Sequence, residues 1–362
     1  MEYNRTKCLD YSIGLFDSTR YEFKFHIKGN STILSTSFGV QLNFLLNNLS
    51  AYSMDKICNN LINQQNPKTG LFVDGNFDVR EATGFEEDYI LWQFTYFTTI
   101  AVDMLGEKPQ YPFNFLSNLT DSKSLESWLE KQDFKNFWYS SNKIMFLFYF
   151  LTYEQERMGL DNRKLINCLF DFLDSKQDPD TGFWGKHAGA NLENSMYGAA
   201  HIYLFYDYHR REINYKEQII DNVIKLQNPN GLFGPNCGGA CEDYNGIEIL
   251  SVLAEKTRHK QEIIKEIISK TYGQIQNNQN RDGGFSYRID NRDIIEKLKN
   301  KIKQRDPSYK YSGWDRMRSN MLKSDLWGTY FRILTLAKIE RMLKINNEDK
   351  YTFYSLPGWG YK

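Results

Sequence analysis

The chain has 362 residues, of which 41% are hydrophobic and 15% aromatic, enough for one large domain or two ordinary ones. Lys and Arg number 45, as do Asp and Glu, so the net charge is zero and argues against nucleic acid or an anionic membrane as a partner. Residues 1–50 contain no apolar run long enough for a signal peptide or a spanning helix, and the five cysteines form no framework, so we expect a cytoplasmic protein without membrane insertion.

A short motif recurs along the chain and gives it an internal repeat. The copies are QNPKTGLFVD from Gln65, QDPDTGFWG from Gln177, QNPNGLFGP from Gln227 and QNRDGGFSY from Gln279, with a copy that lacks the glycine, QDFKNFWYS, from Gln132. SIGLFDSTRYEF, near the start of the chain, is a candidate for a degenerate first copy. Successive glutamines lie 67, 45, 50 and 52 residues apart, and a period near 50 fits two helices with two turns.

The segments between the copies show two kinds of helical pattern. The stretch before a copy is amphipathic, as in Leu165, Leu169, Phe172 and Leu173. The stretches after the copies are more continuously apolar, and they cover 38–46, 90–105, 144–153, 196–206, 247–253 and 326–339. Because helices that are apolar all round are buried, six inner helices should alternate with five or six outer ones. This pattern predicts an all-α protein, a closed (α/α)6 toroid over residues 1–362, with an open solenoid of helix pairs as the alternative.

The motif Q-x-P-x-G-x-F/W before a buried helix resembles the repeat of squalene-type cyclases and of protein prenyltransferase β subunits, over about residues 50–340. The resemblance implies an α/α toroid in which Gln65, Gln177, Gln227 and Gln279 tie adjacent hairpins together. It does not extend to catalysis, since the D-x-D-D acid of the cyclases and the D-x-C zinc ligands of the prenyltransferases have no counterpart here. The nearest local pattern, residues 241–243, reads Cys-Glu-Asp.

In such a toroid the inner helices point their N-terminal ends toward one mouth of the central cavity. Residues just after each turn should therefore converge there, although Asp, Ser and Asn at these places also cap helices. We predict a catalytic set of Glu193, Asp243 and His187, with Glu193 or Asp243 as the base and His187 as the acid. The predicted substrate-binding residues are Asn191, Asn194, Tyr197, Glu242, Tyr244, Glu87, Asp88, Trp314, Arg316, Arg318 and Asp325.

No cofactor is expected. Cys237 and Cys241, with His187 and Asp243, have a spacing that zinc permits, but no second Cys or His pair accompanies them. A buried free cysteine is commonly just a small apolar residue, so we favour no metal.

Residues 289–320 interrupt the repeat, since 44 residues separate Gln279 from Lys323 whereas 15 separate Gln227 from Glu242. This insertion contains a candidate helix around residues 294–303 and is either a solvated surface excursion or a lid over the cavity mouth. The C-terminal residues 351–362, YTFYSLPGWGYK, are too apolar for a free tail and should dock on the body.

Three function classes fit these observations. The first is an enzyme that uses acid/base carboxylates on a carbohydrate or glycan precursor, of hydrolase, lyase or epimerase type, because acids, tyrosines and tryptophans gather at the predicted mouth. The second is an isoprenoid-handling cyclase or prenyltransferase-like enzyme, favoured by the repeat. The third is a non-catalytic helical scaffold. A small-molecule or oligosaccharide substrate is expected for the first, and the sequence does not indicate the oligomeric state.

Overall fold

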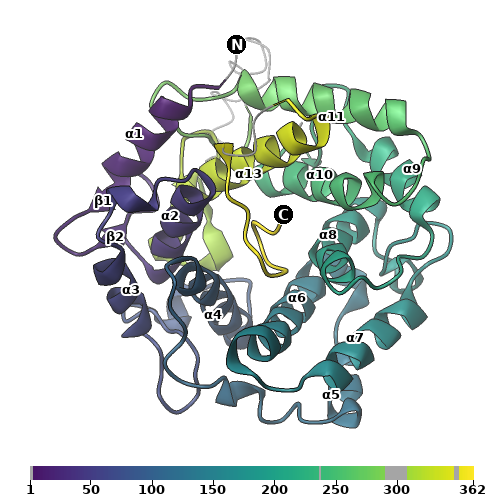
Figure 1. Ribbon diagram of the computed structural model, residues 1–362, viewed down its shortest axis with the longest axis horizontal. Coiled ribbons are helices and arrows are strands. Elements are labelled where there is room, and N and C mark those ends of the chain that lie inside the picture. The colour runs from purple at the N-terminus through teal and green to yellow at the C-terminus, as the bar shows by residue number, and fades with distance from the viewer. Residues whose placement is uncertain (1–2, 236–237, 290–307, 346–349) are drawn as a thin grey trace.

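The computed structural model describes residues 3–235, 238–289, 308–345 and 350–362, and these form two concentric rings of helices (Figure 1). The inner helices are α2 (Ile33–Leu45), α4 (Glu87–Met104), α6 (Phe137–Tyr153), α8 (Leu192–Tyr208), α10 (Ala240–Ala254) and α13 (Leu326–Leu343). The outer helices are α1 (Arg5–Leu15), α3 (Met54–Ile62), α5 (Ser122–Leu129), α7 (Arg163–Lys176), α9 (Lys216–Leu226) and α11 (Gln261–Gln276). Each inner helix packs on the next, and α13 packs on α2, so the ring is closed. The predicted all-α toroid is confirmed.

The apolar pattern of each helix explains its layer. In α6 nearly every side chain is buried, whereas in α9 the buried positions Ile219, Ile220 and Val223 follow one stripe. Five of the six inner helices begin earlier than their apolar runs, as in α6, which starts at Phe137 rather than at residue 144. The apolar pattern missed these first turns because polar residues, such as Ser140, Ser141 and Asn142 of α6, interrupt it.

The strands in the described residues are short. β1 (Phe16–Asp17) pairs antiparallel with β2 (Glu22–Phe23), in the turn where the degenerate first copy was predicted. β3 (Ser308–Lys310) pairs antiparallel with β4 (Arg318–Asn320). This second hairpin belongs to the predicted 289–320 insertion, whose residues 290–307, with the candidate helix, lie outside the described residues.

The repeat glutamines hold each hairpin to the next. Gln227 Nε2 donates to the Gly231 carbonyl of its own turn at 2.9 Å, and to the Ile267 carbonyl of α11 at 2.9 Å. Gln279 makes the corresponding contacts with the N-terminal segment. Its Nε2 donates to the Asn4 carbonyl at 3.0 Å, and its Oε1 accepts from the Asn4 N–H at 2.7 Å. The predicted structural role of these glutamines is confirmed, and the last copy fastens the N-terminal segment to the ring.

Gln227→Ala should lower the free energy of unfolding by about 1–3 kcal/mol, because it removes the donor that serves two partly buried carbonyls. Urea unfolding followed by circular dichroism measures the loss. Gln218→Ala, at an exposed position of α9, is the matched control and should change stability by less than about 0.5 kcal/mol. Equal effects of the two substitutions would contradict the structural role.

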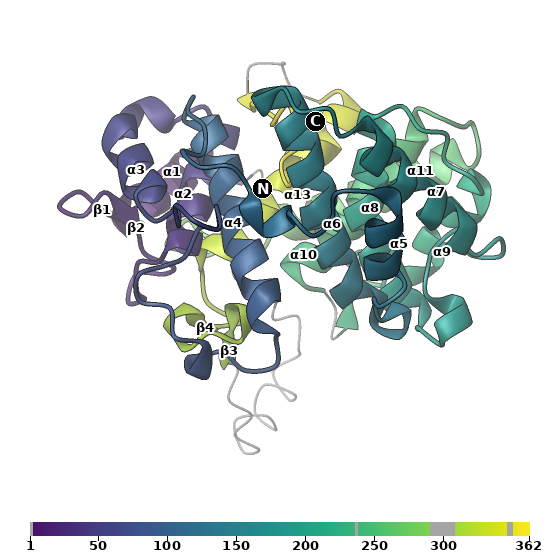
Figure 2. The same ribbon diagram turned by 90° about the horizontal axis from the view of Figure 1, so that it is seen from below.

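The C-terminal residues enter the centre of the ring (Figure 1). Leu356, Trp359 and Tyr361 are buried, and the Trp359 N–H donates to Tyr96 Oη of α4 at 2.9 Å. Figure 2 shows β3 and β4 at one end of the ring and the C-terminus at the other. The tail therefore fills the ring from the end opposite the hairpin.

Candidate functional site

A cavity of about 240 Å³ lies in the middle of the toroid. The inner helices line it mainly with residues of their N-terminal halves, such as Tyr89 of α4, Asn142 of α6 and Asn245 of α10. Its full lining is Phe85, Tyr89, Gln93, Phe97, Trp138, Asn142, His201, Cys241, Asn245, Tyr287, Arg288, Tyr309, Lys310, Tyr311, Ser312, Met321, Trp327 and Trp359. Residues 309–312 thus cover one side, and Trp359 of the tail contributes from another element.

Aromatic rings make up half of this lining. Tyr311 lies on Trp327 with ring centroids 4.5 Å apart, and Trp327 packs on Phe331 at 4.2 Å. None of the described residues that line the cavity is an aspartate or a glutamate. The wall therefore presents π-faces and a few neutral polar groups, with cationic side chains at Arg288 and Lys310.

His201 of α8 contributes a buried imidazole to the cavity wall. Burial lowers the pKa of its imidazole to about 3, so the ring is neutral at physiological pH. Ser141 Oγ lies 2.8 Å from His201 Nδ1 and 3.0 Å from the Trp138 carbonyl. Because that carbonyl can only accept, the serine hydroxyl donates to it and accepts from Nδ1–H. This tautomer leaves Nε2 as a proton acceptor, for which the described residues provide no partner.

The low pKa of His201 predicts a pH-dependent stability. Between pH 6.5 and 3 the unfolded protein binds the proton that the folded protein does not, so this group lowers stability as the pH falls through that range. Relative to His201→Gln, the unmodified protein should lose about 2–3 kcal/mol of unfolding free energy between pH 7 and pH 4.5. Urea titrations at both pH values test this. His187→Gln, at an exposed site, is the control, and the same pH dependence in His201→Gln and the unmodified protein would contradict the assignment.

A second polar group lies where α10 begins. Tyr287 Oη donates to Glu242, with distances of 2.9 and 3.0 Å to the two carboxylate oxygens, and the Cys241 thiol donates to Glu242 Oε2 at 3.1 Å. Burial raises the pKa of the Cys241 thiol, and the Glu242 charge adds to this effect. Cys241 and Tyr287 line the cavity whereas Glu242 does not, so its predicted role in substrate binding stays a prediction.

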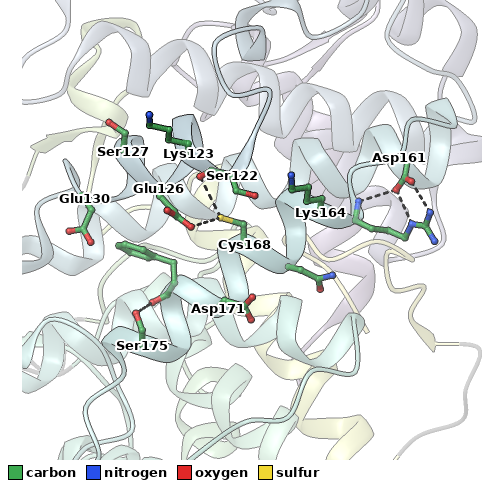
Figure 3. A pocket seen from close by; sticks show the side chains of 13 residues that line it. Ser122, Lys123, Glu126, Ser127, Glu130, Asp161, Lys164, Cys168, Asp171 and Ser175 are labelled. Carbon is green, nitrogen blue, oxygen red and sulfur yellow. Dashed lines mark hydrogen bonds and ion pairs between the residues drawn. The ribbon is translucent and has the colours of Figure 1, made fainter.

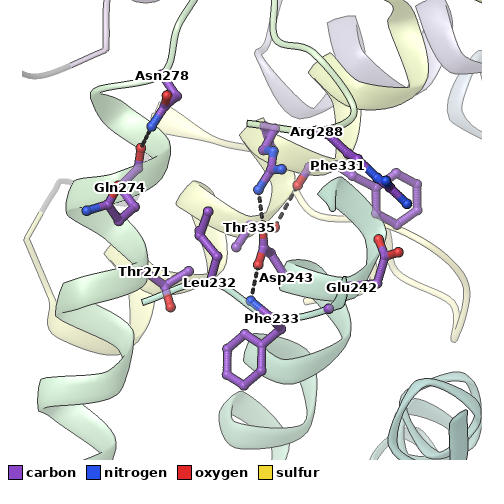
Figure 4. Close-up of polar contacts among 12 residues, drawn as sticks. Leu232, Phe233, Glu242, Asp243, Thr271, Gln274, Asn278, Arg288, Phe331 and Thr335 are labelled. Carbon is purple, nitrogen blue, oxygen red and sulfur yellow. Dashed lines mark hydrogen bonds and ion pairs between the residues drawn. The ribbon is translucent and has the colours of Figure 1, made fainter. Parts of the chain in front are cut away.

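Three of the predicted site residues are fully buried among protein partners. Asp243 forms an ion pair with Arg332 and accepts from the Phe233 N–H at 2.5 Å (Figure 4). Asp325 caps α13 by accepting from the Gly328 N–H at 2.7 Å, and Tyr244 donates to Glu248 at 2.8 Å. None of these three lines the cavity, so their predicted roles toward substrate stay predictions.

Asp325 links several elements as it caps α13. Its Oδ2 accepts from Tyr309 Oη at 2.7 Å and from Ser319 Oγ at 2.8 Å. Burial raises the pKa of its carboxyl to about 6, against these hydrogen bonds. Asp325 thereby ties the hairpin that covers the cavity to the start of α13.

Three of the predicted site residues, His187, Asn191 and Asn194, lie at the start of α8 or just before it. Asn191 caps the helix by accepting from the Asn194 N–H at 2.8 Å, and Asn194 in turn accepts from the Trp138 N–H at 3.1 Å. His187 is exposed and packs on Phe134 with ring centroids 5.8 Å apart. These contacts join the starts of α6 and α8, and none of the three residues lines the cavity.

Glu193 lies in the first turn of α8 and Tyr197 in the second. Burial raises the pKa of Tyr197, and the nearby charges of Glu242 and Glu193 add to this effect. The Tyr197 hydroxyl is buried and has no hydrogen-bond partner among the described residues. The structure thus brings Glu193, Glu242 and Asp243 into the neighbourhood of Tyr197.

The remaining predicted residues lie around the same end of the ring. Asp88 forms an ion pair with Lys143 at 3.0 Å, and Glu87 is exposed in the first turn of α4. Trp314 is fully buried against Phe77, at a centroid distance of 5.6 Å. Arg316 and Arg318 face a separate hollow, so the structure does not group them with the cavity.

Sequence reasoning did not single out His201, Asn245 and Gln93, which do line the cavity. A polar residue inside an otherwise apolar helix was the available signal, as in MYGAAHIYLF around His201. In the described part of the chain no group of three or more His, Cys, Asp or Glu side chains is placed to hold a metal ion. Cys237, half of the zinc pair considered above, lies outside the described residues.

Comparison with known proteins agrees with this geometry. Residues 116–293 match the family model described as the prenyltransferase alpha-alpha toroid domain. The fold is an α/α toroid. The resemblance predicted from the repeat is therefore confirmed.

Solved structures share this toroid. Type II terpene cyclase MstE from Scytonema, in complex with merosterolic acid A, superposes with a TM-score of 0.53 at 13% identity, over 93% of this chain and 96% of that one. The apo form gives 0.52 at 12% identity, over 94% and 98%. A polysaccharide lyase gives 0.49 at 12% identity, over 88% and 93%. A comparison with curated proteins gives no match. The superpositions on the terpene cyclase show a common fold, and at identities this low they leave the function to be argued from the site.

The described helices of the toroid include none with the length and apolar character needed to cross a membrane.

Proposed function

We propose that this toroid is an enzyme whose central cavity holds a short isoprenoid or a similarly apolar substrate. The supporting observation is the lining: nine of its eighteen residues are aromatic, and the described lining includes no carboxylate. Burial of apolar substrate surface against such walls is favourable, and the π-faces of Trp and Tyr attract a positive charge that develops on a substrate. The volume of about 240 Å³ favours a short chain.

The chain offers both a proton acceptor and hydrogen-bonding groups in this setting. Neutral His201 can accept a proton from an apolar substrate at Nε2, with Ser141 holding its tautomer. The Asn245 side-chain oxygen is buried without a partner among the described residues and can accept one hydrogen bond from a ligand. The terpene cyclase in the comparison binds geranylgeranyl dihydroxybenzoate, which belongs to the same broad chemical class.

A carbohydrate enzyme is the second candidate. Sugar rings stack on aromatic side chains, and the amides of Gln93, Asn142 and Asn245 offer hydrogen bonds in the cavity wall. The predicted acid/base set of Glu193, Asp243 and His187 would have to act from outside that wall. Such an enzyme would take a monosaccharide or one end of an oligosaccharide.

Binding to a ligand panel tests the proposal. Farnesol, geranyl and farnesyl diphosphates, monosaccharides, oligosaccharides and nucleotide sugars are titrated into the protein by calorimetry, and bound compounds are incubated and analysed for products. The prenyl compounds should bind, and Tyr311→Ala should weaken them about tenfold by removing a ring of the wall. Tyr215→Ala, at an exposed site, is the control. Binding of sugars alone would favour the second candidate, and binding without turnover would favour a scaffold.

A further inference from the structure

A second hollow, of about 790 Å³, lies on the outside of the β3–β4 hairpin. We call it the basic hollow; its lining comes from residues 26–30, 280–282, 308, 315, 316, 318–320 and 322–324. The hairpin separates it from the central cavity, since Tyr309 and Lys310 line the cavity whereas Ser308 and Arg318 line the basic hollow. It is therefore a distinct site, and it goes beyond the proposed function.

Cationic side chains outnumber carboxylates in this lining, although the net charge of the protein is zero. The cations are Lys28, Arg281, Arg316, Arg318 and Lys323, and the carboxylates are Asp282 and Asp315. Both carboxylates are already engaged. Asp315 pairs with Arg318 at 2.6 Å and with Lys310 at 2.8 Å, and Asp282 accepts from Ser324 Oγ at 2.8 Å.

Four cations consequently remain without a carboxylate partner among the described residues: Lys28, Arg281, Arg316 and Lys323. Arg316 is partly buried, and its Nε is inaccessible and has no hydrogen-bond partner in the described part of the chain. A buried guanidinium nitrogen that lacks an acceptor is costly, and an oxyanion would supply that acceptor.

A groove of similar size on the opposite part of the outer ring gives a contrast. It lies between α5 and α7, with a volume of about 1040 Å³ (Figure 3). Its cations Lys123, Arg163 and Lys164 are outnumbered by Glu126, Glu130, Asp161 and Asp171. An excess of cations is thus not a general feature of the open hollows on this surface.

We propose that the basic hollow binds a phosphate-bearing ligand. Arg316 makes the central contact through its planar fork, and Lys28, Arg281 and Lys323 surround it as point charges. Phosphate matches this set because it presents several acceptor oxygens and more than one negative charge. The ligand can be a free phosphate or diphosphate compound or the headgroup of an anionic lipid.

The test uses the full chain and two probes. Inorganic diphosphate is titrated by calorimetry at low salt, and co-sedimentation is measured with phosphatidylcholine vesicles with and without phosphatidic acid. Arg316→Gln should weaken the binding of whichever probe binds by about tenfold. Lys323→Gln, at an exposed position, should weaken it several-fold. The affinity of Arg316→Lys for this probe should lie between the affinities of the unmodified protein and of Arg316→Gln. Lys123→Gln and Lys164→Gln, in the α5–α7 groove, are the matched controls and should stay within about twofold.

The outcomes separate the two sources. Diphosphate binding that Lys323→Gln and Arg316→Gln weaken supports a soluble ligand, and sedimentation only with phosphatidic acid, weakened by the same variants, supports a lipid headgroup. Added salt should weaken either response. If neither probe binds, or if the hollow and groove variants behave alike, the proposal is overturned. If Arg316→Gln does not fold, Lys323→Gln alone tests the proposal. Binding of prenyl alcohols in the central cavity tests the proposed function separately.

Discussion

Asp243→Asn is expected to lower the free energy of unfolding by about 3–5 kcal/mol. Asp243 and Arg332 have no exposed side-chain surface, and they form an ion pair between α10 and α13. The amide would leave the guanidinium charged and unpaired in the interior. The second hydrogen bond of Asp243, from the Phe233 N–H, can survive because the asparagine oxygen still accepts. The loss is thus assigned to the ion pair, and urea unfolding measures it.

A double variant separates the pair from the single charge. Burial raises the pKa of the Asp243 carboxyl and Arg332 opposes this effect, so the intact pair is itself costly to desolvate. Asp243→Asn combined with Arg332→Met removes both charges and should recover most of the lost stability. Glu193→Gln is the matched control in the predicted acid set and should change stability by less than about 0.5 kcal/mol. A stable Asp243→Asn protein that lacks only activity would instead favour the predicted catalytic role.

Trp359→Ala should also lower the free energy of unfolding by about 3–5 kcal/mol, because it empties space at the centre of the ring. The Trp359 ring packs on His201, Tyr244 and Phe331 at centroid distances of 5.3, 5.2 and 5.3 Å. Thermal and urea unfolding report the change, and Ile345→Ala, at a side chain that is 49% exposed, is the control.

The same substitution probes the cavity, since Trp359 lines it. If the central cavity holds an isoprenoid, Trp359→Ala should shift the preference toward a longer chain, measured at a temperature where the variant is folded. Trp359→Phe should cost less stability and leave the preference nearer to that of the unmodified protein. An unchanged preference in the folded Trp359→Ala variant would place the substrate elsewhere.

The repeat made the architecture predictable from the sequence. A glutamine, a turn and a buried aromatic recur with a period near 50, and each copy precedes a helix whose apolar residues leave no exposed face. Such helices can be buried together only in an inner layer, so the two rings followed. The resemblance to the toroid family implied the tying role of Gln227 and Gln279. Five of the six inner-helix starts were placed too late because polar residues near the start of each helix interrupt the apolar pattern.

The sequence also predicted that the N-terminal ends of the inner helices would meet at one cavity, and the lining residues of α4, α6 and α10 lie there. It did not determine which polar side chains face that cavity. A polar residue at a helix start can cap the helix, join a neighbour or meet a ligand, and Asn191, Asp88 and Asp243 take the first two options. That choice depends on the rotation of each helix about its axis, which packing sets. His201 became a candidate base, and Trp359 part of the cavity, only when the ring closed around the tail, because their partners Ser141 and Phe331 are distant in sequence and adjacent only in the folded toroid.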